Sequence, residues 1–190
     1  GIELVAQNLR RAVMEPLNFE ARTNMMYASY ISAQAFNSGG LGIIHSISHA
    51  VSAFYDSHHG LNNAIALPRV WEYNMPTCYK RFRDIAKAMG ENVDGLSDVS
   101  AAERAVEAAI RLSKDVNIPA NFTSVGSYTK SQMGKGRYAE ASSAKIAGDD
   151  RDIERITHHV LGDGSTPGNA RECNFESVAP VVRHSLVGVY

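Results

Sequence analysis

The stretch HSISHAVSAFYDSHHGLNNA, residues 45–64, contains four of the seven histidines of the chain. His45 and His49 are four positions apart, so on a helix they lie one above the other and their imidazoles can address the same ion. We expect His59 in the first turn of the next helix, with Ser57 as its N-cap. The positive end of a helix favours neutral imidazole, which is the form that binds a metal. Spacing alone therefore makes His45, His49 and His59 equal candidates for one metal site.

Other interpretations of these histidines stay open at this point. The side chains could cap helix ends and hydrogen-bond to one another, or they could serve a hydrolase that activates water on a metal. The pair is not H-E-x-x-H, because residues 46–48 are Ser, Ile and Ser, and this excludes a zinc protease of that type. Asp56 is the nearest carboxylate, but its position at a helix break favours a cap. Three histidines suit Zn²⁺ or Fe²⁺, whereas Mg²⁺ and Ca²⁺ prefer oxygen ligands.

Outward from this stretch, apolar residues recur mainly at helical spacing, and few segments are typical of strands. We expect Asn18 to cap a helix that runs to about residue 36, and Ser100, three residues before Glu103, to form a capping box. Pro68 should bend or end the helix that begins near His59. Further helices are predicted near 2–13, 43–55, 76–89, 150–162 and the C-terminus. The predicted fold class is all-α, with no internal repeat and no clear domain boundary within residues 1–190.

Composition excludes several classes of protein. The formal charge is −1 with both signs interspersed, so no basic block indicates nucleic-acid binding. No apolar run approaches the roughly 18 residues of a membrane span. Cys78 and Cys173 match no CxxC spacing, and we expect two reduced thiols in a cytoplasmic protein. The glycines of GGLG, residues 39–42, follow a predicted helix and not a strand, which favours a tight interhelical turn over a dinucleotide cradle. We expect residues 158–159, both histidines, at the surface.

The order of residues over 35–74 resembles the signature of the iron-containing (group III) alcohol dehydrogenase family. The C-terminal half of that family is an all-α domain with the pattern G-x-x-H-x-x-x-H, then H-G-x-x-N-A and a nearby L-P. The matching positions here are Gly42, His45, His49, His59, Gly60, Asn63, Ala64, Leu67 and Pro68. Within the family, residues 157–182 most closely resemble the nicotinoprotein methanol dehydrogenases, which hold NADP(H) tightly and also dismutate formaldehyde.

The resemblance implies a role for each histidine. His45 and His59 match two of the four ligands of one divalent ion, Fe²⁺ or Zn²⁺, with Mg²⁺ as a further candidate. His49 matches the histidine beside the nicotinamide and the substrate, so it receives a catalytic role in proton transfer and a cofactor-binding role. His58 has no role in the match. The other two metal ligands, an Asp and a His, belong to a helix that we expect before Gly1.

The resemblance also implies the architecture and the function. Residues 1–190 would form the all-α, metal-binding, dehydroquinate synthase-like C-terminal domain of a two-domain dehydrogenase whose N-terminal nucleotide-binding domain is not in this chain. The reaction would oxidise methanol or another small primary alcohol to the aldehyde, with NADP(H) or NAD(H) as cofactor. Without the missing ligands and domain, we expect these residues alone to be inactive. A large homo-oligomer is expected, and a metal-dependent hydrolase or a non-catalytic helical module are the alternatives.

Overall fold

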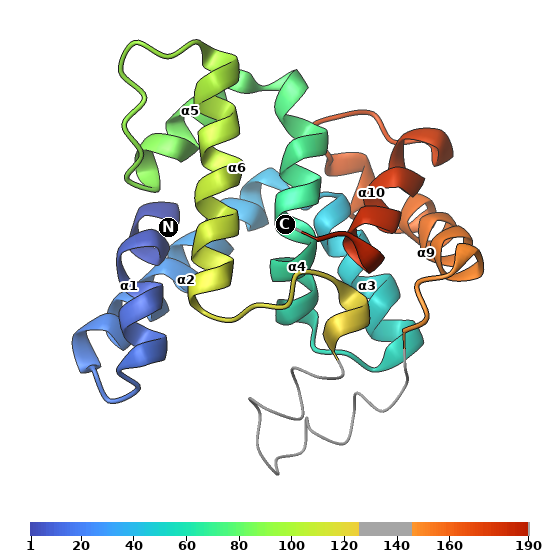
Figure 1. The fold of residues 1–190 in the computed structure, drawn as a ribbon, viewed down its shortest axis with the longest axis horizontal. Coiled ribbons are helices and arrows are strands. Elements are labelled where there is room, and N and C mark those ends of the chain that lie inside the picture. Colours follow the sequence, from blue (N-terminus) through green and yellow to red (C-terminus); the bar gives the residue numbers. More distant parts are fainter. Residues whose placement is uncertain (126–145, 190) are drawn as a thin grey trace. The chain divides into compact units, whose positions relative to one another are not determined.

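The computed structural model describes residues 1–125 and 146–189, and every regular element within these two ranges is a helix (Figure 1). This confirms the all-α fold class. The chain groups into two compact units, the first made of residues 1–40 and 74–117 and the second of residues 41–73 and the described residues from Ile118 onward. That both units belong to one domain, as the sequence suggests, stays a prediction.

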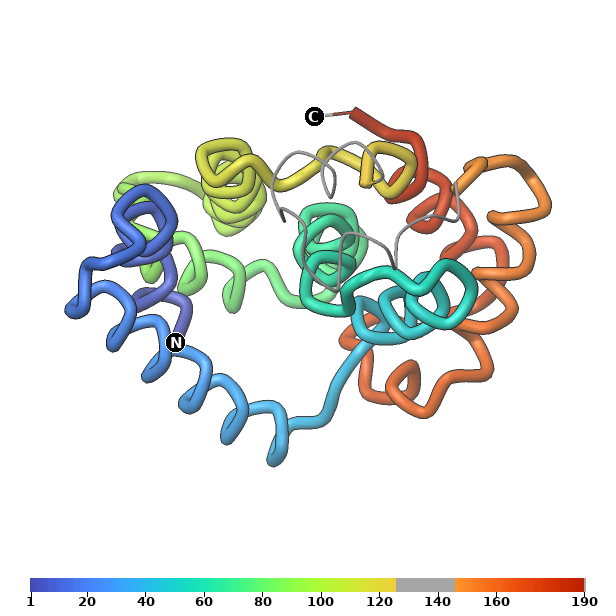
Figure 2. The backbone as a smooth tube through the Cα atoms, turned by 90° about the horizontal axis from the view of Figure 1, so that it is seen from below, coloured from blue at the N-terminus to red at the C-terminus, as the bar shows by residue number. Residues whose placement is uncertain are grey.

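The first unit opens with a helical hairpin. Helices α1 (Ile2–Met14) and α2 (Phe19–Gly39) pack side by side, and α2 continues beyond the end of its partner (Figure 2). Asn18 starts α2, because its Oδ1 accepts the backbone N–H of Ala21 at 3.0 Å, which confirms the predicted N-cap. Between the helices, the amide of Asn24 donates to the buried Asn8 at 3.0 Å.

A second pair of helices completes this unit. Helices α5 (Tyr79–Ala88) and α6 (Asp98–Asp115) pack closely, because the buried face of α6 carries small side chains. These are Ala101, Ala102, Ala105, Ala108 and Ala109. The predicted capping box at Ser100 is wrong: α6 begins earlier, where Ser97 Oγ accepts the backbone N–H of Ser100 at 3.1 Å. The short 3-10 turn η1 (Met75–Thr77) precedes α5 and carries Pro76 in its first turn.

The second unit is built around α3 (Ile43–Tyr55), which packs against α9 (Asp150–Gly162), while α9 also packs against α10 (Phe175–Val187). Figure 1 shows these three helices as neighbours. Their apolar faces meet in one core, in which the fully buried side chains include Ile43, Ile47, Val51, Ile156, Val160, Val178, Val182 and Leu186. The apolar side chains of α3 hold this helix in the core, and His45 and His49 are on the same helix.

Helix α4 (His59–Asn74) follows α3 after a short connection. It continues through Pro68, so the proline does not end the helix. The predicted cap of α4 is wrong, because the backbone N–H of Leu61 donates to His58 Nδ1 at 3.3 Å, whereas Ser57 Oγ contacts the carboxamide of Asn62. His58 therefore caps a helix. None of the helices in the described part of the chain is both long and apolar enough to cross a membrane.

Candidate functional site

Three histidines meet where α3 and α4 lie next to each other. Helix α3 carries His45 and His49 one turn apart, and α4 begins at His59. The ring centroids of His45 and His59 are 5.3 Å apart, those of His49 and His59 are also 5.3 Å apart, and those of His45 and His49 are 6.2 Å apart. The rings are nearly parallel. The structure thus brings together the three side chains that the sequence singled out.

These histidines do not form a three-ligand cage. Among residues 1–125 and 146–189, no three His, Cys, Asp or Glu side chains are arranged to hold one ion. Which of His45, His49 and His59 are metal ligands stays a prediction. A pair of ligands, completed by groups from elsewhere, remains compatible with the geometry.

His45 and His59 have the electrostatic properties of such a pair. Burial lowers the pKa of His45, and the neighbouring imidazoles of His59 and His49 lower it further, while Asp163 acts in the opposite direction. Burial likewise lowers the pKa of His59, followed by the effects of His49 and His58. Both shifts favour the neutral imidazole that binds a metal. The donor set therefore fits a divalent ion of the Zn²⁺ or Fe²⁺ type.

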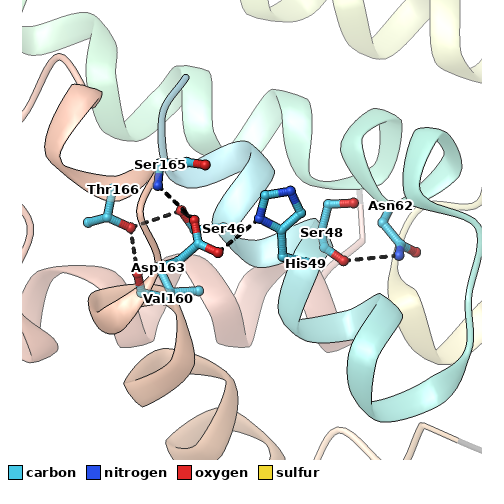
Figure 3. Close-up of polar contacts among 8 residues, drawn as sticks. All are labelled: Ser46, Ser48, His49, Asn62, Val160, Asp163, Ser165 and Thr166. Carbon is cyan, nitrogen blue, oxygen red and sulfur yellow. Dashed lines mark hydrogen bonds and ion pairs between the residues drawn. The ribbon is translucent and has the colours of Figure 1, made fainter. Parts of the chain in front are cut away.

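His49 has a different environment. Its Nδ1 lies 2.9 Å from Oδ2 of Asp163, and its other ring nitrogen points away from the carboxylate (Figure 3). The His49 side chain is 38% exposed and the Asp163 side chain only 13%. One ring nitrogen is thus bound to the protein, and the side chain as a whole is only partly buried.

The carboxylate of Asp163 is itself held firmly, directly after the end of α9. Its Oδ1 accepts the backbone N–H of Ser165 at 2.8 Å and the hydroxyl of Ser46 at 3.1 Å, and Ser46 Oγ lies 2.8 Å from Thr166 Oγ1 (Figure 3). Burial alone would raise the pKa of Asp163, but the hydrogen bonds from Ser165, His49 and Ser46 outweigh it and lower the pKa to about 2. The group is therefore an anion at any physiological pH.

Sequence reasoning missed Asp163, because Asp56 is the carboxylate nearest to these histidines along the chain. Asp56 is exposed and ends α3 in a left-handed conformation (φ 50°), which confirms its role as a cap residue. Asp163 is 114 positions from His49. The available signal was the order Asp-x-Ser after an amphipathic helix, in which the aspartate receives the N–H two residues on. That order predicts a turn but gives no partner for the carboxylate.

Comparison with known proteins gives the family. Residues 1–186 match the family model described as Fe-containing alcohol dehydrogenase family, C-terminal. The chain belongs to this family. It is 62% identical, over 99% of its length, to methanol:N,N-dimethyl-4-nitrosoaniline oxidoreductase of Amycolatopsis methanolica. It is 34% identical, over 98% of its length, to the NAD-dependent methanol dehydrogenase of Bacillus methanolicus.

A solved structure agrees with this assignment. The crystal structure of a 1,3-propanediol oxidoreductase superposes with a TM-score of 0.83 at 36% identity, covering 97% of this chain and 43% of that one. The chain likewise covers 44% of the Amycolatopsis protein and 43% of the Bacillus protein. It therefore spans less than half the length of these relatives, and it corresponds to the C-terminal domain of the Fe-containing alcohol dehydrogenases.

In this family member, buried amide and hydroxyl groups join the two helices that carry the histidines. The Asn62 carboxamide is fully buried, and its nitrogen donates to Ser52 Oγ at 3.0 Å and to Ser57 Oγ at 2.7 Å. Ser48 Oγ of α3 donates to the backbone carbonyl of His59 at 2.8 Å. These bonds fix the start of α4 against α3, and so they set the separation of the histidine rings.

The glycine motif before α3 serves close packing. A Cβ on Gly42 would lie 2.9 Å from Asn169 Oδ1, and the same oxygen accepts the backbone N–H of Ile43 at 3.4 Å at the start of α3. A Cβ on Gly168 would lie 2.2 Å from the carbonyl oxygen of Leu41. The glycines let the loop after α9 reach the start of α3. The predicted tight turn lies between α2, which ends at Gly39, and α3, which begins at Ile43.

The remaining candidates lie outside the site. His158 and His159 are exposed, as predicted, and their rings contact Phe175 and Phe54 at centroid distances of 5.0 Å and 5.4 Å. Both cysteines, Cys78 and Cys173, are free thiols.

Proposed function

We propose that this chain is the metal- and substrate-binding half of a metal- and nicotinamide-dependent alcohol dehydrogenase, which oxidises methanol or another small primary alcohol to the aldehyde. The observation that carries the proposal is the division of the three histidines. The rings of His45 and His59 are adjacent and their pKa values are lowered, whereas His49 is bound through one nitrogen to an ionised carboxylate. Family membership and the printed names of the relatives support the same reaction class.

His45 and His59 would hold the ion. Two imidazoles are a partial ligand set, and the remaining ligands would come from outside the described residues. When bound, Fe²⁺ or Zn²⁺ supplies a Lewis acid that polarises the oxygen of the substrate, and Mg²⁺ is a further candidate. An oxidised nicotinamide, NAD⁺ or NADP⁺, would serve as the hydride acceptor of the reaction.

His49 would transfer the proton. Its Nε2 would accept the hydroxyl proton of the alcohol during oxidation and would pass that proton to water. The exposure of the ring, 38%, gives the proton a path to solvent. His49 would also contact the nicotinamide, as the family resemblance implies, so it would be both the catalytic and the cofactor-binding residue of this chain.

The finer features of the enzyme follow from the resemblance of residues 157–182 to nicotinoprotein methanol dehydrogenases. We propose NADP(H) that stays bound between turnovers, activity in formaldehyde dismutation, a large cytoplasmic homo-oligomer, and an N-terminal nucleotide-binding domain that completes the site. The name of the Amycolatopsis relative includes N,N-dimethyl-4-nitrosoaniline as a reaction partner of methanol. Methanol-dependent bleaching of that dye without added nucleotide tests the bound cofactor, and light scattering tests the assembly.

Metal analysis of the full-length enzyme tests the assignment of ligands. His45→Ala and His59→Ala should each reduce the bound metal to a small fraction of one ion per subunit, while the exposed His158→Ala keeps it. Full metal content in either ligand variant would contradict the assignment. A metal-loaded wild type without nicotinamide or alcohol turnover would favour the hydrolase, and a wild type without stoichiometric metal would favour the non-catalytic helical module.

A further inference from the structure

The contact between His49 and Asp163 determines more than the position of the imidazole. A neutral imidazole carries its proton on one ring nitrogen and a lone pair on the other. Asp163 is an anion and can only accept a hydrogen bond. The Nδ1 of His49, 2.9 Å from Oδ2 of Asp163, must therefore be the protonated nitrogen. The lone pair then belongs to Nε2.

The carboxylate has little freedom to turn away from this role. Its Oδ1 accepts hydrogen bonds from the backbone N–H of Ser165 and from the hydroxyl of Ser46. Asp163 is also the C-cap of α9, where its own backbone N–H donates to the carbonyl of Val160. Ser46 lies on α3 one turn before His49, and is fully buried. The same helix thus supplies both the imidazole and a hydroxyl that orients its partner.

We propose that Asp163 is a positioning residue that holds His49 in the Nδ1–H tautomer, so that Nε2 is the proton acceptor for the alcohol. The proposal rests on the proposed function in one respect, the use of His49 as the acceptor. The assignment of the tautomer stands on the contacts alone. Carboxylate partners of this kind fix the orientation and the tautomer of imidazoles at many sites.

Replacement by asparagine gives a sharp test, because the surroundings dictate how the new amide lies. The Oδ1 position faces two donors, Ser165 N–H and Ser46 O–H, so the amide oxygen of Asp163→Asn must take that place. The amide nitrogen then faces His49 Nδ1 and donates to it. Only the Nε2–H tautomer accepts this bond, and in that tautomer the nitrogen that faces the alcohol has no lone pair.

The experiment measures tautomer and turnover in the same full-length enzyme. Nitrogen-15 NMR of histidine-labelled protein, with the His49 signal assigned by its loss in His49→Gln, should report Nδ1–H in the wild type and Nε2–H in Asp163→Asn. The kcat for alcohol should fall by about 10²–10⁴-fold, the usual contribution of a general base, while KM and metal content change little. Asp149→Asn is the matched control: it makes the same change at the other end of α9, where asparagine is as good an N-cap as aspartate, and should alter neither quantity.

Two results would overturn the proposal. An Asp163→Asn enzyme that keeps the Nδ1–H tautomer would show that the carboxylate does not set it. A tautomer that changes without loss of kcat would show that Nε2 is not the acceptor that Asp163 positions. Full turnover in His49→Ala, by contrast, would refute the proposed role of His49 and leave the tautomer assignment intact.

Discussion

Replacing Gly168 by alanine should be among the most damaging single-methyl changes in this chain. The new Cβ would lie 2.2 Å from the carbonyl oxygen of Leu41 and 3.3 Å from its carbonyl carbon. Both atoms belong to the backbone directly before α3, so no side-chain rotation relieves the clash. The φ angle of Gly168 is outside the left-handed region, so the strain comes from the contact and not from the backbone conformation of the residue.

The expected cost follows from this contact. Gly168 itself is exposed, so the cost comes from the contact with the backbone of Leu41 alone. Overpacking of a close contact costs about 1–3 kcal/mol, and a clash with backbone belongs at the upper end of that range. Moving the loop also weakens the bond from Ile43 N–H to Asn169 Oδ1, which adds about 1 kcal/mol. We therefore expect Gly168→Ala to lower the free energy of unfolding by about 3–4 kcal/mol, which is more than a hundredfold change in the unfolding equilibrium.

Urea denaturation followed by far-ultraviolet circular dichroism measures this change. Two nearby glycines are matched controls, because a Cβ on Gly162 or on Gly164 meets nothing within 4 Å. Gly162→Ala, at the end of α9, should be neutral or stabilising by up to about 1 kcal/mol, and Gly164→Ala should be close to neutral. A Gly168→Ala protein within about 0.5 kcal/mol of the wild type, or indistinguishable from the two controls, would refute the packing argument.

Three further changes test other parts of the second unit. Asn62→Ala should destabilise the protein by about 2–4 kcal/mol in urea denaturation, because the hydroxyls of Ser52 and Ser57 and the carbonyl of Ser48 lose the amide that contacts them. A cost under about 1 kcal/mol would contradict this. Asn174→Ala should cost about 0.5–2 kcal/mol by removing the capping box of α10, and Asn174→Ser should restore most of it. The pKa of Asp163 is lowered from 3.8 to about 2, so its contribution to stability is present above pH 4 and is lost as the pH falls from 4 to 2. Thermal denaturation of Asp163→Asn should show a weaker loss of stability over that interval than the wild type, and parallel curves would contradict the assignment.

The local signals of the sequence identified one helix N-cap correctly and missed two others. Asn18 caps α2 as predicted, because the bond from Ala21 N–H spans only three residues. Two other cap predictions were wrong by one to three residues: Ser97 starts α6 in place of Ser100, and His58 caps α4 in place of Ser57. These choices depend on how the preceding loop enters the helix, which its packing decides.

The sequence by itself determined the helical class, the family and the three histidines of the site, because helical periodicity and a motif of many fixed positions are properties of neighbouring residues. It left the histidines equivalent in spacing and gave no partner to His49. Only the tertiary structure supplied Asp163, when the packing of α9 against α3 brought together residues 114 positions apart. A hydrogen bond depends on separation in space, and the fold sets that separation. The same packing makes Gly168 and Gly42 necessary, since only a residue without a side chain lets two segments of backbone approach so closely.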